Sequence, residues 1–396
     1  MTLTDIRTCA MNLERIDTHG HLETGVPDLR ELVALFKFDQ PATTASLIGS
    51  RLYAEGCRQA YGMDPGAFLT SAAPAELFAR AAERRSAGAR AMFERSLDEA
   101  RVIGMFGFCD HAPERSDLRE FSPRCRLLAY IDPAILGDFQ TYSPDFPPPW
   151  PHYDRLCELF GPLGGLDDYL SALDAAIDGW RSHGVVGMKT SLAYTLGLSF
   201  GDPSPADARR AFAARRDMTP ADIRTVQDFA FRHALRACRR NELPVVVHTG
   251  FQIWGHANLA QSNPMLLHPL LIDPRYKDMT FVLLHGGQPY IGETTYLAGM
   301  FPNVILDFTW IGWMAPTRFG FALAEWLEMV PPHKFCWGSD CGNEPETIAG
   351  VNHIVRTALA DALESAVTRR VMDEPAAMAF LQQTYQDTPR RVFGVF

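Results

Sequence analysis

The feature that most constrains the fold is a recurring pair: a short apolar segment typical of a strand, followed by a longer stretch of helical character. Eight such apolar segments occur along the chain, at 14–17, 101–108, 126–132, 184–189, 243–249, 280–285, 303–308 and 333–340. Nearly continuous apolar strands that alternate with helices indicate a parallel sheet buried on both faces. Eight of these pairs predict an α/β protein, a (β/α)8 TIM-type barrel that spans residues 1–396 as a single domain.

Sequence signals also predict where some helices begin. Thr219 precedes Pro220 and Asp222, an N-cap followed by proline, which predicts a helix over 220–240. Asn263 and Pro264 open a second helical segment in the same way.

Two long insertions interrupt the alternation of strands and helices. Residues 24–100 follow the first strand and are mostly helical by pattern, and residues 136–165 form a Pro-rich loop after the third strand. Insertions after strands lie on the catalytic face of a barrel, so we expect both to form a lid or a contact with a partner.

Composition excludes several classes of function. Hydrophobic residues make up 47% of the 396 residues, which is enough for a large core. The net charge of -10 argues against nucleic acid and anionic membrane surfaces as partners. No apolar run reaches the ~18 residues of a membrane helix. The N-terminus lacks a signal sequence and the eight cysteines are scattered, so we expect a cytoplasmic protein with reduced thiols.

Polar residues stand at the C-terminal ends of five predicted strands. His19 and His21 end the first strand, and the residues that end the fourth, fifth, sixth and eighth strands are Lys189, His248, His285 and Asp340. Alternation along a strand places both residues of a His-x-His pair on one face. Strand ends of this kind meet at the catalytic face of a barrel, where imidazoles and a carboxylate supply the ligands that Zn²⁺ or a similar ion prefers.

The pattern of strand-end residues resembles the metal-dependent amidohydrolase superfamily over nearly the whole chain. Within it, the sequence is most similar to the branch related to the amidohydrolase domain fused to glutamine-synthetase-like proteins. The segments that carry this resemblance are 184–198, 245–251, 263–271, 282–308 and 337–340. One departure stands out: that branch usually has an arginine after the tyrosine at position 194, and this chain has Thr195.

The resemblance implies a divalent metal, Zn²⁺ or alternatively Mn²⁺, held by His19, His21 and Asp340, with His248 as a further ligand. A bound ion would lower the pKa of its water, and Asp340 would accept and return the proton. His285, if it is not itself a ligand, would polarise the scissile carbonyl or orient the water. Lys189 either bridges two metals as a carboxylated lysine or binds substrate as an ammonium; the sequence context favours a single ion. The predicted substrate contacts are Tyr194, His111, Gln252 and Trp310.

The leading hypothesis is therefore a metal-dependent hydrolase of C–N bonds, with a γ-glutamyl amide as a substrate suggested by resemblance only. Two alternatives stay open: a decarboxylase or uronate-isomerase-like enzyme on the same scaffold, and a catalytically silent binding barrel. Decarboxylases of this superfamily often begin with Glu-x-His, and this chain has His19 at that first position. We expect a small-molecule substrate and a homo-oligomer, with residues 24–100 as the candidate interface.

Two further carboxylates, Asp132 and Asp307, either orient a histidine or cap a loop.

Overall fold

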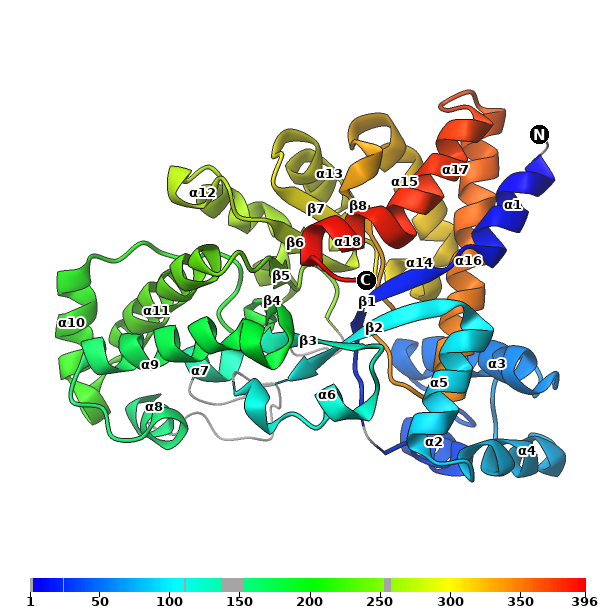
Figure 1. Ribbon diagram of the computed structural model, residues 1–396, viewed down its shortest axis with the longest axis horizontal. Coiled ribbons are helices and arrows are strands. Elements are labelled where there is room, and N and C mark those ends of the chain that lie inside the picture. The colour runs from blue at the N-terminus through cyan, green and yellow to red at the C-terminus, as the bar shows by residue number, and fades with distance from the viewer. Residues whose placement is uncertain (1–2, 24, 110–111, 137–151, 253–257) are drawn as a thin grey trace. The chain divides into compact units, whose positions relative to one another are not determined.

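The eight predicted strands are present and follow one another in a single sheet in chain order (Figure 1). The computed structural model describes residues 3–23, 25–109, 112–136, 152–252 and 258–396. The strands are β1 (Arg15–Gly20), β2 (Val102–Cys109), β3 (Cys125–Tyr130), β4 (Val185–Thr190), β5 (Val245–Val247), β6 (Phe281–Leu283), β7 (Val304–Asp307) and β8 (Phe335–Cys336). The strands are parallel and alternate with helices along the chain, which confirms the predicted (β/α)8 barrel.

The chain forms two compact units. The first unit comprises Met1–Gly107, Asp117–Arg126 and Asp307–Phe396, and it contains β1, β8 and most of β2. The second unit comprises Phe108–Ser116 and Leu127–Leu306, and it contains β4, β5, β6 and most of β3 and β7.

The first unit contains the long insertion after β1, and the prediction that this insertion is mostly helical is confirmed. The helices of the unit are α1 (Leu3–Asn12), α2 (Leu29–Phe36), α3 (Thr44–Tyr61), α4 (Ala75–Arg85), α5 (Ala89–Ala100), α6 (Leu118–Phe121), α14 (Ile311–Met314), α15 (Pro316–Met329), α16 (Pro345–Thr368), α17 (Glu374–Gln382) and α18 (Thr388–Phe393). Helix α2 begins at a capping box in which Asp28 and Glu31 satisfy each other's backbone N–H groups.

Helices α3 and α16 touch backbone to backbone at two glycines. A Cβ atom on Gly56 would lie 2.0 Å from the carbonyl oxygen of Glu346, and one on Gly350 would lie 2.5 Å from the carbonyl oxygen of Leu52. Atoms do not approach so closely, so only glycine allows this crossing. The insertion is therefore packed directly against the helix that follows β8.

A buried ion pair reinforces this contact. Glu346, in the first turn of α16, is fully buried and accepts a hydrogen bond from the Tyr61 hydroxyl at 2.5 Å. Both terminal nitrogens of Arg85 donate to its carboxylate at 2.9 Å. Burial alone would lower the pKa of Arg85, but the attraction of Glu346 raises it above its ordinary value. The positive end of the α16 dipole also favours a carboxylate at this position.

The second unit holds an array of in-register parallel strands. Lys189 of β4 pairs with Val246 of β5, and Val247 of β5 pairs with Leu283 of β6. The helices of this unit are α7 (Asp132–Leu136), α8 (His152–Phe160), α9 (Leu166–Gly179), α10 (Pro205–Ala213), α11 (Pro220–Arg240), α12 (His268–Leu271) and α13 (Ile291–Met300). The predicted helix over 220–240 is confirmed as α11, with Thr219 as its N-cap. No helix within the described residues is long and apolar enough to cross a membrane.

One prediction about a loop and one about a helix need correction. The segment 136–165 is not a loop throughout, because residues 152–160 form α8, which buries Tyr153 and Leu156 on one face; residues 137–151 lie outside the described residues. Asn263 caps the next segment as predicted, but Pro264–Leu267 is a 3-10 turn before α12. Pro269 has no N–H group to continue an α-helical ladder through this segment.

We expect the substitution Gly56→Ala to lower the free energy of unfolding by about 1–3 kcal/mol or more, because its methyl group would clash with the α16 backbone. Gly320→Ala in α15 is the matched control. Its Cβ would meet nothing within 4 Å, so it should stabilise the helix by roughly 0.5–1 kcal/mol. Urea denaturation of the three proteins measures both effects, and equal stabilities for the two variants would contradict the close crossing.

Candidate metal centre

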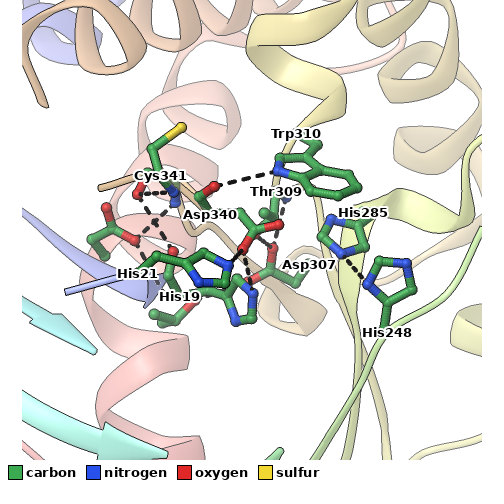
Figure 2. A network of polar contacts seen from close by, with 12 residues as sticks. His19, His21, His248, His285, Asp307, Thr309, Trp310, Asp340 and Cys341 are labelled. Carbon is green, nitrogen blue, oxygen red and sulfur yellow. Dashed lines mark hydrogen bonds and ion pairs between the residues drawn. The ribbon is translucent and has the colours of Figure 1, made fainter. Parts of the chain in front are cut away.

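Two imidazole side chains of the first unit converge on one carboxylate oxygen. Nε2 of His19 lies 2.8 Å from Oδ1 of Asp340, and Nε2 of His21 lies 2.9 Å from the same oxygen (Figure 2). Potential ligand atoms of the three residues all lie within 4.8 Å of one another. The side chains of His19 and Asp340 are 1% and 3% exposed, whereas that of His21 is 56% exposed. Two members of the cluster, His19 and Asp340, are therefore buried, and the imidazole of His21 faces solvent.

Backbone hydrogen bonds place Asp340 against the two histidines. The Asp340 N–H donates to the His19 carbonyl at 2.6 Å, and the His21 N–H donates to the Cys341 carbonyl at 2.9 Å. These bonds extend the pairing of β1 with the chain that follows β8. The offset between the His-x-His pair and Asp340 is therefore set by the main chain.

Asp340 itself has a left-handed backbone, with φ of 53°. Aspartate adopts this conformation more readily than a bulky residue does. Burial alone would raise the pKa of Asp340, but the neighbouring His19 and His21 hold the pKa well below its ordinary value. The residue is therefore a carboxylate at neutral pH, which is the form that binds a cation.

A second buried carboxylate, Asp17, supports the same loop. It is fully buried, and its Oδ1 accepts hydrogen bonds from the Ser339 N–H at 2.8 Å and the His19 N–H at 3.2 Å. Burial raises the pKa of Asp17 to about 7, and the hydrogen bonds from Ser339 and His19 oppose that rise. Asp17 was not among the predicted site residues, although its spacing of two from His19 and four from His21 puts all three on one face.

Asp307, at the end of β7, caps a loop. Its Oδ1 accepts from the Thr309 N–H at 2.7 Å and from the Thr309 hydroxyl, and its Oδ2 accepts from the Thr18 hydroxyl at 2.8 Å (Figure 2). Burial raises the pKa of Asp307, and the charge of Asp340 adds to the rise. Of the two roles left open by the sequence, loop capping is the one these hydrogen bonds support.

Trp310 lies in the same unit, directly beside the candidate centre. Its side chain is buried, and its indole N–H donates to the Asp340 carbonyl at 3.4 Å. This contact gives Trp310 a structural connection to Asp340; its predicted contact with substrate stays a prediction.

The second unit brings His248 and His285 together. Nε2 of His285 lies 2.9 Å from Nδ1 of His248 (Figure 2). Nε2 of His248 lies 2.9 Å from the Phe251 carbonyl oxygen. Because a carbonyl only accepts hydrogen bonds, His248 carries its proton on Nε2 and accepts from His285 at Nδ1. Metal binding by His248 would therefore have to replace one of these two bonds, and its role as a ligand stays a prediction.

Two predicted substrate contacts lie next to this histidine pair. The ring centroids of Tyr194 and His248 are 4.6 Å apart. The Gln252 side chain is buried, and its amide donates to the Ala193 carbonyl at 2.9 Å. The remaining predicted contact, His111, lies outside the described residues.

Glycines make the turn at His285 possible. His285, Gly286 and Gly287 have positive φ angles of 68°, 58° and 68°. A Cβ atom on Gly287 would lie 1.8 Å from Oγ1 of Thr294, so a side chain is excluded there. This left-handed turn ends β6 sharply and leaves His285 two residues after the last residue of the strand, Leu283.

Lys189 is buried in β4, with Nζ 5.6 Å from the ring centroid of Phe108. The carboxylate of Asp132 accepts from the Thr190 hydroxyl at 2.7 Å and from the Ser191 N–H at 2.9 Å. Burial raises the pKa of Asp132 to about 6. Asp132 therefore fixes the end of β4 directly after Lys189 and, like Asp307, caps a loop.

We expect Asp132→Asn to change how stability depends on pH. The folded pKa of Asp132, about 6, exceeds its ordinary value of 3.8, so the folded chain retains a proton that the unfolded chain loses. The stability this group contributes is present below pH 4 and is lost as the pH rises to about 6. The wild-type free energy of unfolding minus that of the variant should fall by on the order of 3 kcal/mol between pH 4 and pH 7.

Urea denaturation across this pH range provides the measurement. Asp222→Asn is a control of opposite sign, because hydrogen bonds from Thr219 lower the pKa of Asp222. A wild-type-minus-Asp132→Asn difference that stays flat with pH would show that Asp132 is ionised throughout.

Comparison with known proteins supports the predicted family. The sequence matches the amidohydrolase family model over residues 16–395. Protein fluG of Emericella nidulans is 34% identical over 197 residues, which cover 44% of this chain and 22% of that protein. The match to this curated relative therefore spans less than a quarter of its length.

Solved structures share the fold at low sequence identity. A protein provisionally named a metal-dependent hydrolase, from Lactobacillus casei, aligns with a TM-score of 0.71 at 17% identity, covering 98% of this chain and 97% of its own. A glucuronate isomerase from Caulobacter crescentus gives 0.71 at 14% identity, with 99% and 93% covered. A uronate isomerase from Thermotoga maritima gives 0.67 at 14% identity, with 99% and 97% covered. With the family model matched along almost its whole length, the chain belongs to the amidohydrolase family.

Proposed function

We propose that the protein is a metal-dependent hydrolase that cleaves an amide-type C–N bond. The observation that carries this proposal is the convergence of two imidazole nitrogens on one buried carboxylate oxygen, in His19, His21 and Asp340. The amidohydrolase family implies a divalent metal. This cluster is the one group of three or more His, Cys, Asp or Glu side chains in the described part of the chain with the spacing to hold one.

The donor set fits a divalent ion. Two neutral imidazoles and one carboxylate are ligands that Zn²⁺ accepts, and such a three-ligand set leaves a position for water or substrate. Because Asp340 stays ionised while nearly fully buried, a cation would supply the counter-charge that its environment favours. We propose a single ion, with Zn²⁺ or alternatively Mn²⁺ as its identity.

When bound, such an ion lowers the pKa of a water molecule towards 7 and so supplies a nucleophile at neutral pH. The protein's own groups then carry out proton transfer and orientation. Asp340 would accept a proton from the attacking water at its carboxylate and deliver that proton to the nitrogen of the leaving amine. For the second unit we propose that His285 polarises the scissile carbonyl and that Lys189 binds substrate as an ammonium.

An isomerase acting on sugar acids is the second candidate. Of the solved structures with this fold, one is named a glucuronate isomerase and one a uronate isomerase, and each is 14% identical to this chain. Thr195 stands where the related branch usually has an arginine, and if that arginine binds a substrate carboxylate, the substrate here differs from that of the branch. A decarboxylase is disfavoured, since His19 replaces the glutamate with which that group often begins.

Metal content tests the proposed centre. We expect about one divalent ion per chain by elemental analysis, and we expect His19→Ala to weaken metal binding about a hundredfold or more, since even residues outside the coordination sphere contribute 10–100-fold. Asp340→Asn should lose turnover more than it loses metal. His183→Ala, outside the cluster, is the matched control and should retain its metal. A wild-type protein that binds no Zn²⁺ or Mn²⁺ would refute the proposal.

A substrate screen separates the candidate reactions. N-acyl and γ-glutamyl amides, sugar acids and aromatic acids are each incubated with the metal-loaded protein, and release of amine, formation of a keto sugar and release of CO₂ are measured. We expect amine release, abolished in Asp340→Asn. Isomerisation of a sugar acid without any amine release would favour the second candidate instead.

A further inference from the structure

Two indole groups hold the main chain on either side of Asp340. Nε1 of Trp313 donates to the Ser339 carbonyl at 2.9 Å, and Nε1 of Trp310 donates to the Asp340 carbonyl at 3.4 Å. Figure 2 shows the second of these contacts. Both tryptophans follow β7, whereas the opposite side of the same loop is bonded to β1 through its N–H groups. Consecutive peptide groups of the loop are thus fixed from both sides.

The backbone at Trp310 is strained. Its φ and ψ are 65° and −58°, and the Ile311 N–H donates to the Thr309 carbonyl at 2.8 Å, which closes a three-residue γ-turn with positive φ. This turn is rare and costly, above all for a bulky residue. Such strain persists where the surroundings over-determine it, and it concentrates at functional sites.

The strained turn has a specific geometric result. The γ-turn at Trp310 leads directly into α14, on which Trp313 lies. The same turn therefore places both indole N–H groups within hydrogen-bonding distance of neighbouring carbonyl oxygens. Asp307 caps Thr309 on the other side of the turn, as described above. The turn is therefore held at both ends, and its position is tied to that of the Asp340 loop.

We propose that Trp310 and Trp313 are positioning residues that fix the direction of the Asp340 carboxylate towards His19 and His21. The left-handed backbone of Asp340 sets where its side chain points, and the two indoles hold the carbonyls that define this backbone. Neither indole N–H needs to touch the metal or the substrate. The effect of the two indoles on metal binding rests on the proposed metal centre, whereas their hydrogen bonds to the loop do not depend on it.

Trp313→Phe and Trp310→Phe test the proposal, because each keeps an aromatic ring and removes only the N–H donor. Trp326→Phe is the matched control. Trp326 lies in α15 of the same unit and is fully buried, and its Nε1 has no hydrogen-bond partner among the described residues. Two readouts are taken: amide hydrogen exchange of residues 337–344 in the metal-free protein, and titration with Co²⁺ followed by its visible absorption.

We expect Trp313→Phe to speed exchange in 337–344 and to raise the Co²⁺ dissociation constant about tenfold, since residues that orient a ligand contribute 10–100-fold. Trp310→Phe should act in the same direction and more weakly, because its hydrogen bond is longer. Trp326→Phe should leave the exchange of this segment and the Co²⁺ spectrum unchanged, even if its melting temperature falls.

The two readouts distinguish failures. Unchanged exchange in both Trp313→Phe and Trp310→Phe would overturn the positioning role, as would equal effects from Trp326→Phe. Faster exchange in a protein whose wild type binds no Co²⁺ would support the positioning of Asp340 and refute the proposed metal function. Faster exchange with unchanged Co²⁺ affinity would overturn the inference that the indoles orient the carboxylate for metal.

Discussion

The hydrogen bonds between β1 and the chain after β8 are the constraint on which the candidate metal centre depends. They join the Asp340 N–H to the His19 carbonyl and the His21 N–H to the Cys341 carbonyl. In a strand, a slip of one residue turns every side chain to the other face. A one-residue change in this pairing would therefore separate the two imidazoles from the carboxylate. The register of the pairing thus determines the geometry of the candidate ligands.

Three buried carboxylates lie around this pairing, and their pKa values are shifted in different directions. Asp17 and Asp307 are held by N–H and hydroxyl donors, and burial raises the pKa of both. Asp340 alone has imidazole partners, and its pKa is lowered. Groups of the same chemical type thus divide into two that shape the loops and one that is kept ionised, a division set by environment rather than by residue type.

The insertion after β1 is coupled to the same region through α16. Glu346 lies six residues after Asp340 and binds Arg85 and Tyr61 of the insertion, beside the glycine crossing of α3 and α16. Breaking a buried pair by removing one partner is costly, because the other charge is left without compensation. This part of the insertion is therefore fixed to the helix that follows the Asp340 loop.

The sequence by itself determined the eight strands, the helical insertion and the placement of His19 and His21 at the end of β1, because hydrophobic periodicity and caps are local signals. Asp340 was predicted to end the eighth strand, whereas it lies in the loop, four residues after β8 ends at Cys336. The sequence did not predict α8, because this helix follows a Pro-rich stretch and is stabilised by the burial of Tyr153 and Leu156. Nor did it predict the contacts of Asp17, Ser339 and Trp313. Only the tertiary structure decided these. The physical reason is that the Asp17 carboxylate meets the Ser339 N–H across a separation of 322 residues, and no local pattern encodes which distant donor will satisfy a buried acceptor.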